Sequence, residues 1–409
     1  MRRWSVIWLL TVMVSLSAWA QQSTTVSGKV VSGTTGKVVS GASVSGGGQT
    51  VVTNDDGYFL LKSQSALTEI VVSHVGYRSE RIREKSGRWK EGGLRIRLQP
   101  TSIQLQEVFV LAGADPRELV ESAISKIPQN YGREPELFHS FYRETAMKRQ
   151  HHIMVAEGVV DMYKTPYSHG VGRDRVAIRK GRRLLSPRQG DTLGVKVMGG
   201  PIVPVQIDVV KNGGFLLNKE ELDNYVLLME QPTTIDDRRQ YVVSLSPGRT
   251  APYALYYGRL YIDQETLAFS RIELSLDMSD REKASQLMLI KKPQGVRFRP
   301  KELSLLIDYR PDDDGTMFLS YVRATFRFHC DWHRKLFATA FVACCEMVVT
   351  SHERAGSSQP ITGRESFDQR DAFFDKVDYF RDSLFWKDYN IIEPTESLDR
   401  AIDKLLKKH

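Results

Sequence analysis

The stretch AFSRIELSLD, from Ala268 to Asp277, alternates between two kinds of side chain and indicates the fold of the larger part of this chain. Mostly apolar residues occupy one set of positions: Ala268, Ser270, Ile272, Leu274 and Leu276. Mostly polar residues occupy the other: Phe269, Arg271, Glu273, Ser275 and Asp277. Because successive side chains of a strand point to opposite faces, this period predicts a β-strand with one buried and one wet face.

The same alternation extends from Phe138 to about Thr350 and predicts a long antiparallel sheet. Further strands are expected at Gly258–Asp263, Leu287–Ile290, Val296–Pro300, Leu303–Tyr309, Phe318–Phe328 and Phe337–Val349. Turns are expected at residues 264–266 and 311–315. A meander of this length is expected to curl into a curved sheet, a half-barrel or an open barrel.

Residues 23–110 predict a smaller antiparallel β-sandwich of seven strands, because runs rich in Val, Ile and Thr alternate with turn residues. The expected strands are Thr25–Val31, Ala42–Ser45, Thr50–Thr53, Tyr58–Lys62, Glu69–Ser73, Arg78–Ile82 and Leu94–Leu98. Residues 54–57, Asn-Asp-Asp-Gly, are interpreted as a turn between two of them. A calcium loop would need a 12-residue frame that ends in a bidentate Glu, and the sequence does not supply it.

Several motifs follow one another in this first region: Gly28-Lys29-Val30-Val31, Gly41-Ala42-Ser43-Val44, Thr53 with Asp56-Gly57-Tyr58-Phe59, His74-Val75-Gly76-Tyr77, and Leu94–Leu98. As an ordered set they resemble the carboxypeptidase regulatory-like domain, a transthyretin-like sandwich. The resemblance implies a domain that is not itself catalytic. The region is also similar to the N-terminal extension of TonB-dependent outer-membrane receptors, in which a segment like Leu105–Val110 follows. The roughly 300 residues that remain are too few for the 22-stranded barrel of such receptors.

Helices are expected at three places. Residues 111–132 predict a linker and a helix, in which Asp115 caps, Pro116 starts and Glu118 completes a capping box. Leu119, Ala123 and Ile127 form its apolar stripe, which Pro128 ends. A second stripe, Phe373, Val377, Phe380 and Leu384, predicts a helix packed over the sheet or acting as a lid over a groove. A last helix is capped by Thr395 or a neighbour, and its apolar side is Leu398, Ile402 and Leu405.

The larger region, residues 133–409, contains further family-like phrases. Tyr257–Asp263 resembles the lipoprotein-carrier fold, a half-barrel that shelters acyl chains. The region as a whole resembles an uncharacterised companion domain of exported bacterial proteins. That resemblance rests on Leu137–Glu144, on Gly199-Gly200-Pro201 and on Asn390–Leu398. It implies no activity that can be transferred.

The first twenty residues predict a cleaved secretory signal: Arg2 and Arg3, an apolar run, and Ala18-Trp19-Ala20 before the cut. None of the three cysteines lies near this site, so a lipid anchor on an N-terminal cysteine is not expected. Without Arg2 and Arg3, 55 basic residues face 49 acidic ones, a formal charge of +6. This excess is too small to indicate a nucleic-acid partner.

The sequence predicts no catalytic, cofactor-binding or metal-binding residue. His352-Glu353, His151-His152 and the pair His329 and His333 lack the ligand spacing of a zinc site. No Gly-x-Ser-x-Gly, phosphate-binding loop or dinucleotide fingerprint is present. Ligand-binding residues remain unassigned, although a catalytic triad assembled from distant residues stays open.

Two clusters have both a structural and a functional interpretation. Cys344-Cys345 is expected to be core, and at most one of the two could bond Cys330. Seven basic residues crowd together: Arg173, Arg175, Arg179, Lys180, Arg182, Arg183 and Arg188. With Lys180-Gly181 interpreted as a hairpin tip, they would form a solvated face or meet anionic lipid headgroups or lipopolysaccharide.

The sequence therefore predicts a mainly β, non-enzymatic binding or accessory protein of the periplasm or outer-membrane periphery. Its expected partners are an envelope protein and a lipid or other hydrophobic ligand, with no cofactor. The alternatives are a hydrolase acting on envelope glycan or peptide, and a scaffold for an outer-membrane complex.

Overall fold

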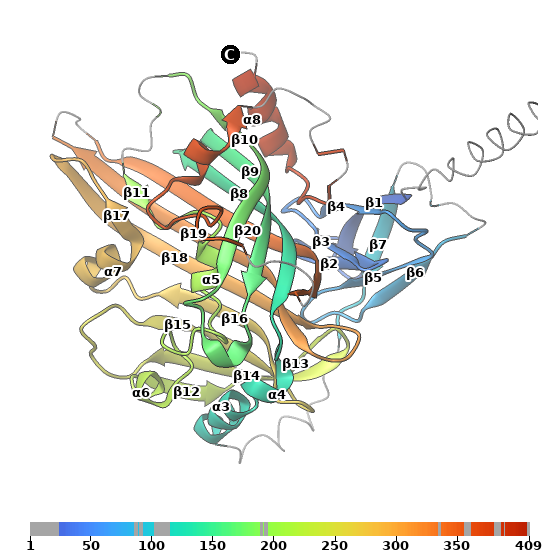
Figure 1. The fold of residues 1–409 in the computed structure, drawn as a ribbon. Helices are drawn as coiled ribbons and strands as arrows, with labels where there is room; N and C mark the ends of the chain where they lie inside the picture. Colours follow the sequence, from blue (N-terminus) through green and yellow to red (C-terminus); the bar gives the residue numbers. More distant parts are fainter. Residues whose placement is uncertain are drawn as a thin grey trace, which may run out of the picture.

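The computed structural model describes residues 24–85, 89, 93–101, 115–188, 191, 195–333, 337–355, 361–379, 386–387 and 389–406. The predicted signal peptide, the segment Leu105–Val110 and residues 111–114 lie outside them. The described chain is mainly β, as predicted, and has a small N-terminal sandwich beside a large curved sheet (Figure 1). No helix among the described residues is long and apolar enough to cross a membrane.

The sandwich has the seven predicted strands, which form one sheet of order β4-β1-β7 and another of order β3-β2-β5-β6. Their bounds are β1 Thr24–Ser32, β2 Ser43–Gly46, β3 Gln49–Val52, β4 Tyr58–Ser63, β5 Glu69–Ser73, β6 Glu80–Arg83 and β7 Leu94–Leu98. Val30, Val44 and Leu61 are among the buried side chains between the sheets. One pairing departs from the antiparallel prediction: β7 returns from the other sheet and runs parallel to β1.

The turn at residues 54–57 forms as predicted between β3 and β4. The Asn54 side-chain oxygen accepts hydrogen bonds from the backbone N–H groups of Asp56 and Tyr58, at 3.0 and 2.9 Å. Gly57 has a φ of 80°, which a glycine adopts without steric cost. The turn thus carries Asp55 and Asp56 outward from the sandwich, toward the large sheet.

The large sheet contains 12 strands in the order β12-β14-β15-β16-β18-β19-β20-β8-β9-β10-β21, with β13 paired to β14. The bounds are β8 Glu136–Lys148, β9 His151–Lys164, β10 Arg175–Leu185, β12 Tyr225–Met229, β13 Thr233–Ile235, β14 Arg238–Pro247, β15 Tyr256–Asp263, β16 Phe269–Leu276, β18 Val296–Pro311, β19 Met317–Trp332, β20 Thr339–Arg354 and β21 Asp378–Tyr379. A separate pair joins β11, Lys196–Val197, to β17, Leu289–Lys291. The central strands run side by side as long, twisted ribbons (Figure 1).

Two strand predictions need correction. Residues 296–309 form one strand instead of two, because a bulge between Pro300 and Glu302 lets the chain stay paired with β19. Leu287 belongs to α7, Arg281–Met288, which Asp280 caps by accepting from the backbone N–H groups of Glu282 and Lys283.

The alternation of residues 268–277 is confirmed, with one exception. Ile272, Leu274 and Leu276 are at most 4% exposed, whereas Arg271 and Glu273 lie on the other face. Phe269 is also fully buried. A register shift between Tyr261 and Ile262 of β15 disturbs the pairing next to Phe269, so the period of two is interrupted there.

The apolar face of the sheet is covered by the protein's own chain. Residues 195–222 cross it and include α5, Val203–Gln206, and α6, Lys219–Leu222. Their buried side chains join the main core: Val195, Val197, Val203, Val205, Ile207, Val209, Val210, Leu216, Leu217 and Leu222. The apolar face is therefore the centre of the fold. The opposite face is covered in part by the sandwich and the C-terminal segment, which pack against it in two smaller apolar clusters.

Two of the three predicted helices form. Asp115 caps α3, Pro116–Ser125, by accepting from the backbone N–H of Arg117 at 2.8 Å, and a short α4, Ile127–Asn130, follows. In α8, Glu396–Leu406, the Thr395 hydroxyl accepts from the Leu398 N–H, and Leu398, Ile402 and Leu405 are buried.

The helix predicted from Phe373 to Leu384 is wrong in its described part. Phe373–Lys376 is a short 3-10 helix, η3, and Asp378–Tyr379 is strand β21, parallel to β10. A Cβ at Gly158 or Gly181 would overlap Phe373 or Val377, respectively, so these two side chains fit where the sheet has no side chain. Phe380 and Leu384 lie outside the described residues.

Candidate functional site

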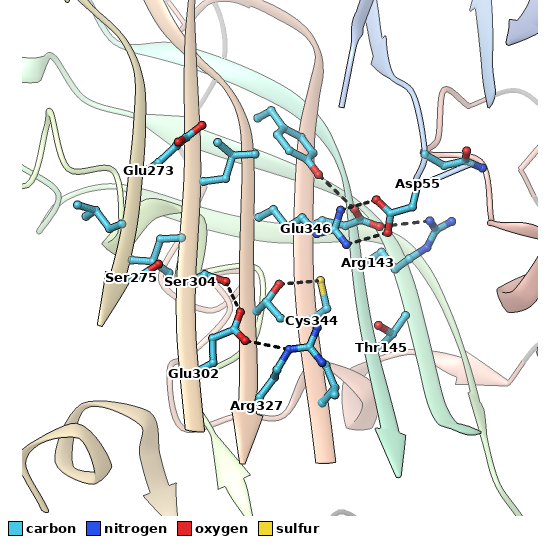
Figure 2. Close-up of a pocket in the computed structure, with 18 of the residues that line it drawn as sticks. Asp55, Arg143, Thr145, Glu273, Ser275, Glu302, Ser304, Arg327, Cys344 and Glu346 are labelled. Carbon is cyan, nitrogen blue, oxygen red and sulfur yellow. Dashed lines mark hydrogen bonds and ion pairs between the residues drawn. The ribbon is translucent and has the colours of Figure 1, made fainter. Parts of the chain in front are cut away.

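A hollow of about 1170 Å³ lies on the polar face of the large sheet, and we call it the polar groove. Its floor is formed by strands β8, β14, β15, β16, β18, β19 and β20. The sandwich turn at residues 53–56 forms one part of its wall, and residues 392–398 form another. Figure 2 shows charged and hydroxyl side chains that project from neighbouring strands into this space.

The floor of the groove contains polar pairs, some within one strand and some between adjacent strands. Arg327 of β19 bonds Glu302 of β18 at 3.0 Å, and the Ser304 hydroxyl donates to the same carboxylate at 3.1 Å (Figure 2). Arg271 and Glu273 of β16 bond each other at 2.8 Å. These side chains hold one another in place, as opposite charges on adjacent strands do.

The charges of the groove are nearly balanced. Six arginines line it: Arg143, Arg149, Arg259, Arg271, Arg323 and Arg327. Seven acidic side chains line it as well: Asp55, Asp56, Glu230, Glu273, Glu302, Glu346 and Glu393. A lining of this kind offers hydrogen bonds of both polarities, and its balanced charge does not favour a long polyanion.

The turn at residues 54–57 joins the sandwich to the groove. The sequence had predicted a turn here but no contact with the rest of the chain. Both carboxylate oxygens of Asp55 accept from Arg323, at 2.7 and 2.9 Å. The hydrogen bond from Arg323 holds the pKa of Asp55 below its usual value. Asp56 accepts from the backbone N–H of Glu396 at 2.7 Å, and the Asn54 amide donates to the Pro394 carbonyl at 2.9 Å.

A buried ionic centre, formed by Arg143, Glu157, Arg182 and Trp386, lies at the wall of the groove. Arg143 donates two hydrogen bonds to one oxygen of Glu157, at 2.9 and 2.7 Å. The other oxygen accepts from Arg182 at 3.0 Å and from the Trp386 indole at 2.9 Å. Burial alone would raise the pKa of Glu157, but the two arginines outweigh it and lower that pKa. Arg143 also donates to the Ile392 carbonyl at 2.6 Å, which fixes the C-terminal wall.

Strand β8 links this centre to the packed face. Glu144, the residue after Arg143, points to the opposite side, where it accepts from the Tyr142 hydroxyl at 2.7 Å and from the Gly200 backbone N–H. Burial raises the pKa of Glu144. Gly200 has a φ of 92°, and a Cβ there would overlap Phe367, so no other residue fits without strain. The three segments that resemble the companion domain thus meet at β8.

A second buried ionic cluster anchors the covering segment, and the sequence analysis did not find it. Lys164 of β9 pairs with Asp208, whose other oxygen accepts from the Tyr309 hydroxyl at 2.8 Å. Lys211 bonds Asp174 at 2.7 Å. Burial, and then the charge of Lys164, lowers the pKa of Lys211 to about 8. The only sequence signal was the presence of charged residues among apolar ones, which does not identify partners.

The histidines considered for metal binding do not converge. His352 packs against the rings of Phe138 and Phe318, and its nearest carboxylate oxygen belongs to Glu136, at 3.7 Å. His329 lies within β19 opposite Arg299 and Ala340. Within the described part of the chain, no group of three or more His, Cys, Asp or Glu side chains is placed to hold a metal ion.

The cysteines are free thiols. Cys344 of β20 lies opposite Thr325 of β19 and lines the groove (Figure 2), whereas Cys345 faces the packed side. Cys330 lies opposite Thr339, and it is five residues further along β19 than Thr325. That separation, about 17 Å along a strand, rules out a disulfide between Cys330 and either of the other two.

The basic cluster is placed differently from the prediction. Lys180 and Gly181 lie inside β10, at a bulge, and not at a hairpin tip. The wrong interpretation arose because a glycine beside a lysine resembles a turn, whereas this glycine makes room for Val377. Arg179 bonds Asp161, Arg182 bonds Glu157 and Arg183 lies near Asp375, so these charges are largely neutralised.

Comparison with known proteins adds a family for the sandwich. Residues 26–110 match the family model of the CarboxypepD_reg-like domain, which confirms the predicted resemblance. No curated protein matches the sequence.

Three solved structures are similar to part of this chain. One is a DUF1329 family protein from Desulfovibrio piger, with 10% identity over 59% of this chain and 94% of that chain, at a TM-score of 0.24. Another is a putative outer membrane lipoprotein-sorting protein domain from Vibrio parahaemolyticus, with 10% identity over 60% and 95% and a TM-score of 0.26. The third is a LolA superfamily protein from Nitrosomonas europaea, with 14% identity over 56% and 93% and a TM-score of 0.19. At TM-scores this low, the likenesses carry no argument about function.

Proposed function

We propose that this protein is a non-enzymatic binding protein of the cell envelope, whose ligand occupies the polar groove. The observation that carries the proposal is the construction of the groove from three separate parts of the chain. Asp55 of the sandwich bonds Arg323 of the sheet, and Arg143 of the sheet bonds the carbonyl of Ile392. A hollow held open by such contacts is pre-organised, which lowers the entropic cost of binding. The envelope location rests on the predicted signal at residues 1–20.

The ligand that fits this groove best is an extended polar chain, such as a peptide segment of an envelope partner. Each paired arginine or carboxylate can leave its present partner and form a hydrogen bond with a ligand group instead. Ser244, Ser275 and Ser304 add neutral donors and acceptors. Tyr257, which is 49% exposed, adds a flat contact surface. The expected hydrophobic ligand is less well supported, because residues 195–222 already fill the apolar face.

The chemistry of the groove favours binding over hydrolysis. A general acid–base pair needs a carboxyl group that can exchange a proton with the substrate. Three of the seven acidic side chains, Glu273, Glu302 and Glu346, instead pair with arginines at 2.8, 3.0 and 3.4 Å. Glu393 differs from them, because burial raises its pKa. Burial raises the pKa of the Cys344 thiol to about 11, so its nucleophilic thiolate form is disfavoured at neutral pH.

A thermal-shift panel on residues 21–409 tests the proposal. The probes are short peptides of mixed charge, soluble peptidoglycan fragments and a phospholipid above its micelle concentration. We expect a polar probe to raise the melting temperature of the wild-type protein and to have no effect on Ser304→Trp, which fills the groove. The matched control is Ser168→Trp, at an exposed residue of η1, Tyr167–His169, and it should respond like wild type. Stabilisation by the phospholipid alone would contradict the proposal.

A further inference from the structure

A second hollow, of about 860 Å³, lies at one end of the large sheet. We call it the basic hollow. It is enclosed by the β8–β9 turn, by Ser186, Arg188 and Asp191, by Phe337 and the start of β20, and by α8. It adjoins the polar groove, since both are lined by Met147, Arg149, Gln150, His152 and Ser397.

The charge of the basic hollow differs sharply from that of the groove. Five cationic side chains line it, Lys148, Arg149, Arg188, Arg400 and Lys404, together with two histidines. Asp191 is the only acidic residue among the lining residues, and it is already bonded to Lys148 at 2.9 Å. The described residues form no ion pair with Arg149, Arg188 or Lys404. An anionic partner would therefore meet cations that are not already neutralised.

The backbone at Arg149 supports a functional reading of this charge. Arg149 occupies the left-handed region with a φ of 57°, a conformation that glycine or asparagine adopts more readily. Its N–H donates to the Ala340 carbonyl at 2.8 Å, which holds this turn against the start of β20. A two-residue turn between antiparallel strands requires a positive φ of this kind, and this turn places Arg149 in the lining of both hollows.

Apolar side chains accompany these cations. Phe337, which is 80% exposed, lines the hollow just before β20, and Leu406, which is 41% exposed, ends α8. An exposed Phe alone needs no explanation. An exposed aromatic ring beside five cations is the combination that binds a lipid surface. The cations contact lipid phosphates, and the ring enters the headgroup region.

We propose that the basic hollow docks this end of the sheet on an anionic phospholipid membrane. Arg149, Arg188 and Lys404 contact lipid phosphates, and Phe337 enters the interface. The inference does not depend on the ligand of the polar groove. Its consequence is that the groove opens close to the membrane surface, because the two hollows share the β8–β9 turn.

Vesicle sedimentation with residues 21–409 tests this docking. The probes are phosphatidylglycerol-containing vesicles and, for comparison, pure phosphatidylcholine vesicles. We expect binding to the first only, with loss at high salt. Arg188→Gln with Lys404→Gln should weaken binding about 25-fold, at about fivefold per cation, and Phe337→Ser about tenfold. The matched control, Lys37→Gln with Arg97→Gln, removes two exposed cations of the sandwich and should bind like wild type.

Three outcomes would overturn the proposal. One is equal binding to phosphatidylcholine, and another is an equal loss in the sandwich control. The third is that inorganic phosphate blocks binding while Phe337→Ser binds like wild type, which would make a soluble anion the ligand. Melting temperatures close to wild type in every variant establish that the differences do not come from unfolding.

Discussion

The two faces of the large sheet are built by the same strands but have different neighbours. On one face, Glu144 and the apolar side chains of β16 meet residues 195–222, which fill the available space. On the other face, Arg143 pairs with Glu157 and Arg327 pairs with Glu302, and a hollow of about 1170 Å³ remains. The difference teaches that the chain covers one face with its own segment, where burial drives folding, and leaves on the other face the hollow that we propose as the ligand site. Four changes, from the largest expected effect to the smallest, test this contrast.

Arg143→Met should have the largest effect, because it leaves Glu157 buried, with its first oxygen unpaired. Removing one partner of a buried ion pair costs about 3–5 kcal/mol. Urea denaturation should show this loss in the free energy of unfolding. Arg297→Met, an exposed arginine of β18, is the control and should change it by less than about 0.5 kcal/mol. A similar loss in both variants would mean that Arg143 contributes no more to the free energy of unfolding than an exposed arginine does.

Gly200→Ala tests the packed face. The residue has a φ of 92°, and its new methyl group would overlap Phe367, so we expect a loss of about 3 kcal/mol in the free energy of unfolding. Gly213→Ala is the matched control in the same covering segment, since a Cβ there meets nothing within 4 Å. If the two variants melted alike, the tight contact between Gly200 and the sheet would be refuted.

His74 tests the junction of the sandwich with the polar face. Burial, followed by the charge of Arg271, lowers the pKa of His74 to about 4. The carbonyls of Val75 and Ser40 and the carboxylate of Glu273 raise this pKa, but by less. Between about pH 6.5 and 4 the unfolded state therefore binds a proton that the folded state does not, so stability falls as the pH falls. We expect a loss of about 2 kcal/mol over this range that is absent in His74→Gln. Parallel pH profiles of the two proteins would contradict the lowered pKa.

Asp55→Asn should have the smallest effect on stability. The ion pair with Arg323 is partly exposed, so its loss should cost at most about 1 kcal/mol in the free energy of unfolding. Since Asp55 forms a wall of the groove, the variant should still weaken binding of the polar probe that stabilises wild type. Glu69→Gln, which breaks the ion pairs between β5 and β6, is the control for binding, because Glu69 does not line the groove. Unchanged binding in Asp55→Asn would place the ligand elsewhere.

The fold could be predicted from local patterns, and the site could not. The period of two and the turn residues locate most strands of the sandwich and of residues 258–349 to within a few residues, because both act over short stretches. For residues 138–257 they predicted only that strands occur. The pairing of Asp55 with Arg323 and of Arg143 with Ile392 joins residues more than two hundred positions apart. No single-sequence pattern encodes such contacts. The helix predicted at Phe373 failed for the same reason, since Gly158 and Gly181 provide its docking positions from distant strands.

Site-specific photo-crosslinking in the producing cells tests the central claim most directly. A photoreactive side chain at Ser304 samples the polar groove, and the same side chain at Ser168 samples a surface away from it. The mass of each adduct identifies the chemical class of what lies there. We predict peptide adducts at Ser304 that are absent at Ser168. Lipid adducts at Ser304, or the same adducts at both positions, would contradict the assignment of the polar face as the ligand site.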